Sequence, residues 1–542
     1  MALALAACSN VESGTPGDTL TNPPEIRSHD GVLDGTLAIE PATAIVAGEE
    51  VRFDALYDGL YMPPILRVNP GDVVRLGIDN RSTRSINTHY HGLNVSPQPG
   101  SDDVFLDIGF GESYRYDMQI PANHPAGLFW YHPHWHPFTN KDIAGGLSGG
   151  LVVGDILAPF PELRGIPEQF MLLKDLKQTI DGRPEPFPAP AGPTRRTING
   201  YYQPNIAMRP GQIQLWRFGA IGSNIYYRIR MASSPSSGSP SATTSGLGGT
   251  GGESAVSVNH HTLARTAGSD GRPARIPTPD SGSAGQRFYI IAQDGNLQNQ
   301  AIETEDLVLE PGKRLEVLVY GPPAGSYDLV AEPFDTGPQG DAYPGQLLGT
   351  VVSGGDPVTP IPIPKSFPVV RDLRRDPISR TRDVIFSDTN DPNVFTIDGK
   401  SYDPSCVNTV IRLGDVERWR IQNTSPEAHV FHIHQLDYQV VAVDGAEAPF
   451  VGYQDTVSLP PAKQDPANPD SPYGIPSTVE VIIPFTDPVI VGEFVYHCHI
   501  MQHADQGMMA NILVYDPAKP MPDHASCDAG GGNHGSHAGH GG

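Results

Sequence analysis

The sequence predicts an all-β protein made of three similar sandwich domains. The chain has 542 residues, too long for one hydrophobic core and typical of about three domains. Its 59 Gly and 55 Pro divide it into short segments, and no long stretch has the 3.6-residue period of a helix. One sequence pattern also occurs three times along the chain. Short strands separated by turns, in three copies, indicate three β-sandwiches.

Each copy of this pattern is an extended run, a turn that contains Gly, and a second run of alternating residues. The copies are Leu66–Leu76, Met208–Arg217 and Ile411–Arg420. The second and third copies follow Ile198-Asn199-Gly200 and Ile397-Asp398-Gly399, which are typical of turns that enter a strand. The chain therefore uses one structural unit three times.

The repeats divide the chain into three predicted domains, at residues 36–158, 159–360 and 361–517. The middle domain carries an insertion at about residues 232–285, rich in Ser, Gly, Pro, Thr and Ala. Such a segment cannot bury enough apolar surface to offset the entropy of ordering it, so we expect a disordered loop rather than a domain. Residues 518–542 form a tail rich in His and Gly.

The most informative motif is His497-Cys498-His499, followed by His503 and Met508. In an extended strand, Cys498 points to one face while His497 and His499 point to the other. A thiolate, an imidazole and a thioether supply most of a copper site with two His, one Cys and a weak axial Met. The flanking imidazoles suit a second, nitrogen-rich metal cluster, so one strand is predicted to join two metal sites.

Three other segments carry His-x-His pairs, in which a strand places both imidazoles on one face. Imidazole is a ligand that suits copper. The pairs are His89-Tyr90-His91, His132-Pro133-His134 and, within His429-Val430-Phe431-His432-Ile433-His434, His432 with His434.

In order and spacing these four motifs resemble those of the multicopper oxidase family, over roughly residues 40 to 516. The resemblance implies three cupredoxin-like Greek-key domains and four copper ions. It assigns a mononuclear blue copper to His429, Cys498 and His503, with Met508 as axial ligand. It assigns a trinuclear cluster to eight histidines: His89 and His432 for the normal copper, His91, His132 and His499 for one copper of the coupled pair, and His134, His434 and His497 for the other.

One motif departs from the family pattern His-Pro-x-His-x-His-Gly. Val430 replaces the Pro and Gln435 replaces the Gly. We expect these changes to affect loop geometry and not ligation. The resemblance also implies that the mononuclear copper lies inside the third domain, that the cluster lies between the first and third domains, and that the middle domain supplies no ligand.

Oxygen reduction needs proton donors near the cluster, and the family pattern indicates two places for them. One is Asp102 or Asp103, after the first motif, where two adjacent acids leave the register open. The other is Asp505, between His503 and Met508, which is equally suited to accept a hydrogen bond from a ligand imidazole.

The three other cysteines, Cys8, Cys406 and Cys527, bear on the cellular compartment of the protein. In an oxidising compartment Cys406 and Cys527 could pair and attach the tail to the third domain. Leu5-Ala6-Ala7-Cys8 resembles the lipobox of bacterial lipoproteins, but no Lys or Arg precedes Arg27, so either the true start lies upstream or the match is accidental. Residues 1–35 are then a signal remnant and a tether, and we expect an extracytoplasmic protein that is secreted or anchored through lipid at Cys8.

The net charge of −25 argues against nucleic acid as a partner, because phosphate would be repelled. The expected partners are O2 and a small reducing substrate that is neutral or cationic. Contact with a membrane is expected only through the lipid anchor.

The resemblance implies a laccase-like oxidase that couples one-electron oxidation of phenols or aromatic amines to four-electron reduction of O2 to water. An axial Met lowers the potential of a blue copper, which favours easily oxidised donors. One alternative is a metallo-oxidase acting on Cu(I), Fe(II) or Mn(II), although the ten Met of this chain are scattered rather than clustered. Another is a non-enzymatic copper-binding envelope protein. It is disfavoured because scaffold relatives usually lose ligands and this chain has the complete set.

Overall fold

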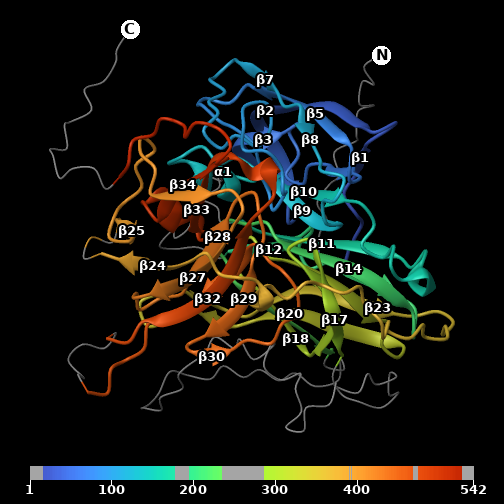
Figure 1. The fold of residues 1–542 in the computed structure, drawn as a ribbon. Coiled ribbons are helices and arrows are strands. Elements are labelled where there is room, and N and C mark those ends of the chain that lie inside the picture. The colour runs from blue at the N-terminus through green and yellow to red at the C-terminus, as the bar shows by residue number, and fades with distance from the viewer. Residues whose placement is uncertain are drawn as a thin grey trace.

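The computed structural model describes residues 16–176, 194–234, 286–389, 391, 393–467 and 474–527. Six sheets of five or six strands form three pairs, one pair for each predicted domain, and a two-stranded ribbon accompanies the second pair. Figure 1 shows the N-terminal pair in blue above the other two. The prediction of an all-β fold is confirmed.

The first pair of sheets runs from Glu25 to Val153. In spatial order, one sheet contains β3 (Glu49–Tyr57), β2 (Val32–Val46), β5 (Val73–Asn80) and β7 (Ser113–Arg115), with β8 (Met118–Gln119) also on β5; the other contains β1 (Glu25–Arg27), β4 (Ile65–Val68), β10 (Gly149–Val153), β9 (Gly127–His132) and β6 (His89–His91).

The second pair runs from Glu168 to Ser353. One sheet contains β12 (Arg195–Ile198), β11 (Glu168–Leu176), β14 (Ile213–Ala220), β19 (Arg314–Tyr320), β16 (Phe288–Gln293) and β17 (Asn296–Thr304); the other contains β13 (Asn205–Met208), β23 (Gln346–Ser353), β20 (Gly325–Glu332), β15 (Tyr227–Ser233) and β18 (Asp306–Leu309); the ribbon is β21 (Phe334–Asp335) with β22 (Ala342–Tyr343).

The third pair runs from Arg380 to Tyr515. One sheet contains β25 (Phe395–Ile397), β24 (Arg380–Asp388), β27 (Asp415–Asn423), β32 (Ser477–Phe485), β29 (Gln439–Val443) and β30 (Ala446–Glu447); the other contains β26 (Thr409–Arg412), β34 (Met509–Tyr515), β33 (Gly492–Cys498), β28 (His429–Ile433) and β31 (Thr456–Leu459).

Helices are few and short in the part of the chain that the structure describes. Two α-helices, α1 (Thr139–Ala144) and α3 (Met501–Asp505), pack against each other, and three 3₁₀ turns are η1 (Pro161–Leu163), η2 (Leu373–Arg375) and η3 (Pro488–Ile490). The contact between α1 and α3 joins the first sandwich to the third.

The three sequence repeats occupy the same place in each sandwich. Each repeat runs from one sheet into the other, as β4–β5, β13–β14 or β26–β27. The first strand of each repeat pairs in parallel with the last strand of its sandwich (β10, β23 or β34). The turn residues Gly71, Gly211 and Gly414 have φ between 76° and 100°, which favours glycine and explains why all three copies contain it.

The N-terminal segment is only partly as predicted. The tether expected within residues 1–35 is wrong for its described portion, because Glu25–Arg27 forms β1 and pairs in parallel with β4. Leu20 is buried in the core of the second sandwich, and Thr19 forms a β-bridge with Asn205. Sequence reasoning missed this because the run is polar and rich in Pro, and its strand partners lie far away along the chain.

Three predictions fall largely or wholly outside the described residues. These are lipidation at Cys8, the disordered insertion at 232–285, of which the structure describes only residues 232–234 at the end of β15, and the His-rich end of the tail. The domain boundaries as independent folding units also stay predictions.

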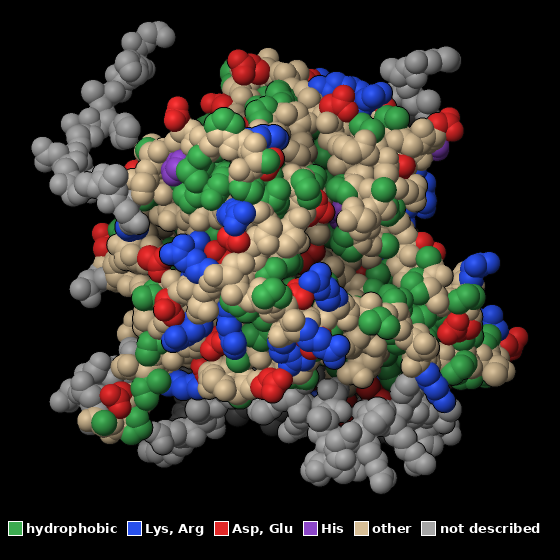
Figure 2. Space-filling model, viewed as in Figure 1, with side chains coloured by type: hydrophobic (Ala, Val, Ile, Leu, Met, Phe, Trp, Pro, Cys, Tyr) green, Lys and Arg blue, Asp and Glu red, His purple; other side chains and the backbone are tan. Residues whose placement is uncertain are grey.

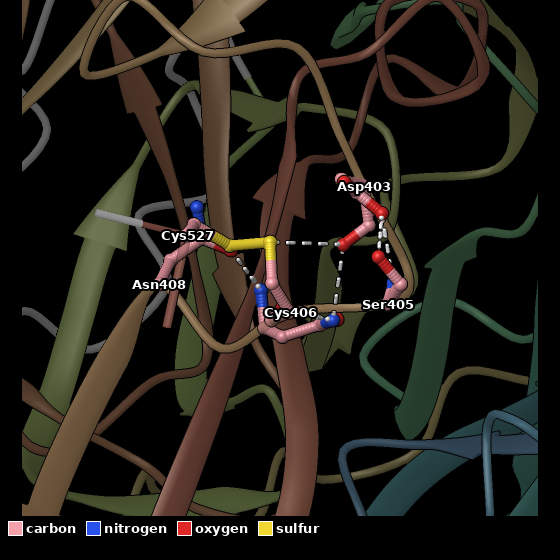
Figure 3. Close-up of a disulfide and its surroundings, with 6 residues drawn as sticks. Asp403, Ser405, Cys406, Asn408 and Cys527 are labelled. Carbon is pink, nitrogen blue, oxygen red and sulfur yellow. Dashed lines mark hydrogen bonds between the residues drawn. A yellow bond between two sulfur atoms is a disulfide. The ribbon is translucent and has the colours of Figure 1, made fainter. Parts of the chain in front are cut away.

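Cys406 and Cys527 form a disulfide, so this predicted pairing is confirmed (Figure 3). Val407 forms a β-bridge with Ser526, and the amide of Cys527 donates to the carbonyl oxygen of Val407 at 3.1 Å. The start of the predicted tail is therefore attached to the third sandwich.

Removing this disulfide should destabilise the protein. The bond closes a loop with a sequence separation of 121, and loops of that size lose much unfolded-state entropy on crosslinking. We expect Cys406→Ser with Cys527→Ser to lower the free energy of unfolding by about 2–4 kcal/mol, measured by urea titration. A change smaller than about 0.5 kcal/mol would mean that the crosslink contributes nothing to global stability.

The charges on the surface are mixed. Figure 2 shows Lys and Arg gathered over the sheet that contains β24, β27 and β32, interleaved with acids. Arg418 pairs with Glu480 at 2.6 Å and Arg420 with Asp383 at 3.4 Å. The basic groups of these strands are thus largely matched by carboxylates. In the described chain no helix has the length and apolar character needed to cross a membrane.

Candidate metal centres

The four His motifs lie on equivalent strand pairs of the first and third sandwiches. In the first, His89 of β6 lies opposite His132 at the end of β9. In the third, His432 of β28 lies opposite His497 of β33. Antiparallel pairing thus brings two motifs together within each sandwich, and the two pairs of strands face each other.

Eight imidazoles meet between these sandwiches in three groups of three, with His91 shared by two of them. Within a group, one ligand atom from each residue lies within 4.8 Å of the others. The groups are His89, His91 and His432; His91, His132 and His499; and His134, His434 and His497. The last two are the triplets that the family resemblance assigns to the coupled pair, and the first contains both residues assigned to the normal copper.

The closest nitrogen contacts are those expected around metal ions. The Nε2 atom of His497 lies 3.2 Å from Nε2 of both His134 and His434. The Nε2 atom of His499 lies 3.1 Å from Nδ1 of His91. Donor atoms bonded to one ion at about 2.0–2.3 Å lie roughly 3–4 Å from one another, so the imidazoles present fit metal ions between them.

The outer nitrogens of several imidazoles are satisfied by oxygen acceptors. Nδ1 of His132 donates to the carbonyl oxygen of Pro133 at 2.8 Å, and Nδ1 of His497 to that of Cys498 at 2.8 Å. Nδ1 of His432 donates to the carbonyl oxygen of Asp455 at 2.9 Å. The Nε2 atoms of His132 and His432 are buried without a hydrogen-bond partner, which leaves them free for metal coordination.

Most of these imidazoles are held in the neutral form that binds metals. Burial, together with the charges of neighbouring imidazoles, lowers the pKa of most of them well below 6.5, and burial lowers the pKa of His132 to about 3. The residues lowered well below 6.5 are His89, His91, His134, His434, His497, His499 and His503. Protonation therefore does not compete strongly with metal binding at neutral pH.

A second centre lies inside the third sandwich, around Cys498. The Sγ atom of Cys498 lies 3.8 Å from Nδ1 of both His429 and His503, and these two nitrogens lie 3.1 Å apart. The ring of Phe395 stacks on His503 with centroids 4.2 Å apart. Two imidazoles and a sulfur within 4.8 Å of one another form a group suited to copper.

Cys498 depends on a cation to become a thiolate. Burial raises the pKa of the Cys498 thiol to about 12, although the amides of Val430 and Ile500 offset part of this effect. A coordinating metal ion deprotonates a thiol outright. This buried sulfur is therefore suited to metal ligation and not to free nucleophilic chemistry.

Residues 497–499 bring the two centres close together, because consecutive residues of one chain segment supply ligands to both. Strand β33 ends at Cys498, with the sulfur among the core residues of the third sandwich. The flanking rings of His497 and His499 lie with centroids 5.5 Å apart, in the cluster between the sandwiches. The structure thus places the sulfur and the flanking imidazoles in different ligand groups.

Met508 is fully buried and close to the mononuclear centre through its main chain. Its amide donates to the carbonyl oxygen of His503 at 2.9 Å, and its carbonyl oxygen accepts from the amide of Cys498 at 3.0 Å. Its role as axial ligand stays a prediction.

Asp102 and Asp103 have different contacts in the structure, which distinguishes the two candidate acids. The buried Asp102 carboxylate lies 3.0 Å from Nδ1 of His89 and accepts from the amide of Tyr90 at 3.0 Å. Burial raises the pKa of Asp102 to about 8, partly offset by that amide. Asp103 instead accepts from the amide of Phe105 at 3.0 Å in a local turn. Of these two acids, Asp102 is therefore the one in contact with the cluster.

Asp505 has a structural environment of its own. Its carboxylate accepts from the amides of Thr139 and Asn140 at the start of α1, at 3.3 and 2.7 Å. The imidazole beside it is that of His136, at 3.9 Å. Asp505 thus links α3 to α1, and no contact places it as acceptor for a predicted ligand in the described chain.

Two residues near the cluster were not identified from the sequence. Asp455 lies 3.5 Å from Nε2 of His91, and Arg314 of the middle sandwich pairs with it at 2.5 Å. Burial alone would raise the pKa of Asp455, but the Arg314 charge holds it well below its ordinary value. No motif marks either residue, and both become visible only when distant segments meet.

Gln435, which replaces the family's Gly, has a role beyond loop geometry. It keeps the left-handed backbone of that position, with φ of 67°. Its Nε2 atom donates to Asp102 Oδ2 at 3.0 Å, across the junction between the third and first sandwiches. This contact helps to fix the acid that in turn contacts His89.

Two carboxyl groups flank the outer side of the mononuclear centre. Asp388 Oδ1 lies 3.1 Å from Nε2 of His429, and Glu427 Oε1 lies 3.5 Å from Nε2 of His503. Burial, followed by the charges of Asp388 and Asp341, raises the pKa of Glu427 to about 8. His503 is 6% exposed whereas His429 is fully buried, so His503 is the ligand nearer to solvent.

Known proteins are similar to this chain over the regions that carry these groups. Two family models described as multicopper oxidase match residues 39–156 and 374–518, the parts that hold the His motifs. A multicopper oxidase, mco, of Staphylococcus haemolyticus is 23% identical over 84% of this chain and 83% of its own length. A laccase of Haloferax volcanii is 23% identical over 91% and 84%, and the cell division protein FtsP of Escherichia coli is 23% identical over 86% and 85%.

The fold has solved counterparts. A multicopper oxidase from Campylobacter jejuni, described as a metallo-oxidase, superposes with a TM-score of 0.71 at 22% identity, covering 93% of this chain and 96% of that one. Its likeness supports three cupredoxin-like domains. With both motif-bearing regions matched by the family models, the chain belongs to the multicopper oxidase family.

Proposed function

We propose that this protein is a laccase-like oxidase with four coppers, which oxidises phenols or aromatic amines and reduces O2 to water. The observation that carries the proposal is that Cys498 belongs to one ligand group while its neighbours His497 and His499 belong to the other. When bound, copper would supply one-electron redox chemistry at the sulfur-containing group and a place for four-electron reduction of O2 at the imidazole cluster.

The protein's contribution between the centres is a short covalent connection. It runs from Sγ of Cys498 through its backbone to the imidazoles of His497 and His499. Each imidazole is fixed by its partners, as Nδ1 of His497 donates to the Cys498 carbonyl oxygen at 2.8 Å. Rigid ligands limit the reorganisation that accompanies each electron transfer.

At the donor end, His503 is the ligand that a reducing substrate can approach. Its Nε2 edge lies beside the Glu427 carboxyl, and its exposed fraction is small but not zero. A phenol hydroxyl group at this edge would find in Glu427 a hydrogen-bond partner to orient it. A substrate held there would be in contact with a ligand of the mononuclear centre.

At the oxygen end, Asp102 holds a proton on Nδ1 of His89. This contact leaves Nε2 of His89, which is buried without a hydrogen-bond partner, for the metal. The carboxyl group also belongs to a hydrogen-bonded connection that includes Gln435. We propose Asp102, and not Asp103 or Asp505, as the acid that serves the cluster.

Copper analysis combined with oxygen uptake tests the proposed function. We expect about four coppers per chain, an absorption band at about 600 nm from the Cys498 thiolate, and oxygen uptake when a phenol is added. A fully copper-loaded preparation that takes up no oxygen with phenols or aromatic amines would contradict the proposal.

A metallo-oxidase acting on Fe(II), Mn(II) or Cu(I) is the second candidate. Asp388, Glu427 and His429 offer ligand atoms within 4.8 Å of one another at the outer side of the mononuclear centre. Carboxylate oxygens suit Mn(II) in particular. The likeness to the Campylobacter metallo-oxidase is a likeness of fold and leaves the donor open.

The two candidates differ in how they use this acidic pair. If the substrate is a metal ion, Asp388→Asn with Glu427→Gln should lower kcat/KM for Fe(II) or Mn(II) by about tenfold or more, a loss of roughly 1.4 kcal/mol, and should lower it less for a phenol, for which Glu427 offers only one hydrogen bond. If the substrate is a phenol, the laccase-like proposal predicts that the wild type prefers the phenol over all three metal ions. Steady-state assays on one preparation distinguish these outcomes.

A non-enzymatic role is a third possibility, and the relative named as a cell division protein is consistent with it. The complete ligand set of this chain favours catalysis.

We also propose O2 and a small reductant as partners, no nucleic acid, and an extracytoplasmic location, with membrane attachment only through lipid at Cys8. The Cys406–Cys527 disulfide supports that location, because disulfides persist in oxidising compartments.

A further inference from the structure

None of the predicted ligands lies among the described residues of the middle sandwich, yet one of its side chains reaches the imidazole cluster. Arg314, the first residue of β19, is fully buried. Its guanidinium donates two hydrogen bonds to Asp455 of the third sandwich, at 2.8 and 2.5 Å. Its Nε atom also approaches the carbonyl oxygen of Leu128 in the first sandwich at 3.4 Å. One side chain therefore contacts all three sandwiches.

Arg314 is itself fixed within its own sandwich. Nη1 donates to the carbonyl oxygen of Gly312 at 3.0 Å, and the Arg314 amide donates to Asp294 Oδ1 at 3.0 Å. The Asp294 carboxylate also pairs with Lys313 at 2.9 Å. Held by the Gly312 carbonyl oxygen and by Asp294, the planar guanidinium of Arg314 is a rigid bidentate donor to the Asp455 carboxylate.

Asp455 faces two imidazoles of the cluster. Its Oδ1 atom lies 3.5 Å from Nε2 of His91 and 3.6 Å from Nδ1 of His432. Its carbonyl oxygen accepts from Nδ1 of His432 at 2.9 Å. The negative charge of the Asp455 carboxylate close to Nε2 of His91, which has no hydrogen-bond partner, favours a proton on that atom, and the Asp455 carbonyl oxygen favours one on Nδ1 of His432. The other nitrogen of each ring, Nδ1 of His91 and Nε2 of His432, is then left for a metal ion.

Gly92 supports the same assignment. It follows His91 directly and has φ of 85°. A Cβ atom at this position would lie 2.3 Å from Nη2 of Arg314 and 2.7 Å from Oδ2 of Asp455. The side-chain-free residue after His91 thus makes room for the Arg314–Asp455 pair.

We propose that Arg314 is a positioning residue for the imidazole cluster, acting through Asp455 to set the ring orientation and tautomer of His91 and His432. The middle sandwich thereby contributes to metal affinity although its described residues include none of the predicted ligands. The inference rests on the proposed function only in taking copper as the metal, and it does not depend on oxygen reduction.

The test compares copper affinity at the two centres by chelator competition, in the full-length protein. The variants are Asp455→Asn, Arg314→Lys, and the double variant Arg314→Gln with Asp455→Asn, which leaves no unpaired buried charge. We expect the dissociation constant of cluster copper to rise about 10- to 100-fold, as for other residues that orient ligands. The affinity of the mononuclear centre and its band at about 600 nm should stay within about twofold of wild type.

A matched control exists in the same sandwich. Arg217 of β14 forms a buried ion pair with Glu316 of β19 and has no contact with a ligand imidazole among the described residues. Arg217→Lys should change the copper affinity of the cluster and that of the mononuclear centre by no more than about twofold, because it disturbs a comparable ion pair away from the cluster.

The outcomes separate this inference from the proposed function. Selective weakening of cluster copper, with a changed paramagnetic resonance spectrum of the normal copper, supports it. Wild-type affinity in Asp455→Asn and the double variant overturns it, as does equal weakening at both centres. A wild-type protein that binds copper but takes up no oxygen would contradict the proposed function and leave this comparison valid.

Discussion

Replacing Cys498 with Ser is expected to abolish turnover while the imidazole cluster keeps its ability to bind copper. A serine hydroxyl group does not replace a thiolate as a copper ligand, and the mononuclear group would retain only His429 and His503, with Met508 nearby. Loss of the sulfur also breaks the connection to His497 and His499. We expect kcat to fall by roughly 1,000-fold or more, which corresponds to about 4 kcal/mol of activation free energy.

Three measurements check this expectation on one preparation. The band at about 600 nm should disappear, oxygen uptake with a phenol should fall to background, and about three coppers per chain should remain. The double variant Cys406→Ser with Cys527→Ser is the control, because it removes two other sulfurs and should keep the band. Oxygen uptake above a tenth of the wild-type rate in Cys498→Ser would show that electrons do not pass through this residue.

The second large effect is expected on removing copper. The cluster brings imidazole nitrogens into close contact, such as Nε2 of His134, His434 and His497, and a bound copper ion would link them. A ligand that binds only the folded state stabilises it by about 4 kcal/mol at 1,000 times its dissociation constant. With several coppers bound, the melting temperature of the copper-loaded protein should exceed that of the apoprotein by roughly 10 °C or more.

Calorimetry of the apoprotein, the copper-loaded protein and the copper-loaded Cys498→Ser variant measures this effect. Readdition of copper should restore the wild-type transition, and the variant should lie between the two states because its cluster still binds metal. Identical melting temperatures with and without copper would mean that the His and Cys groups do not form metal sites of useful affinity in the folded protein.

The sequence was most informative where chemistry follows from local spacing. Glycines at the turns of the three repeats predicted equivalent strand pairs, and residues 71, 211 and 414 adopt the backbone that requires them. The His-x-His spacing predicted imidazoles on a common face because side chains alternate along a strand. Which imidazoles would share a metal came from the family resemblance; two of the structure's groups contain the same triplets, while the group of His89 and His432 also includes His91.

What the sequence could not provide depends on contacts between distant segments. Arg314 and Asp455 are 141 residues apart along the chain, and neither belongs to a motif. By sequence Asp505 is a candidate proton donor beside Asp102 and Asp103, but the packing of α3 against α1 directs its carboxylate to the amides of Thr139 and Asn140. The strand β1 was missed for the same reason, because only β4 makes it a strand.

A single-turnover reaction of the fully reduced, copper-loaded protein with oxygen tests the central claim that the two centres act as one unit. If they do, the band at about 600 nm returns on mixing, about one O2 is consumed per chain, and no hydrogen peroxide is released. A band that stays bleached in oxygen, or one that returns with release of peroxide, would contradict the account.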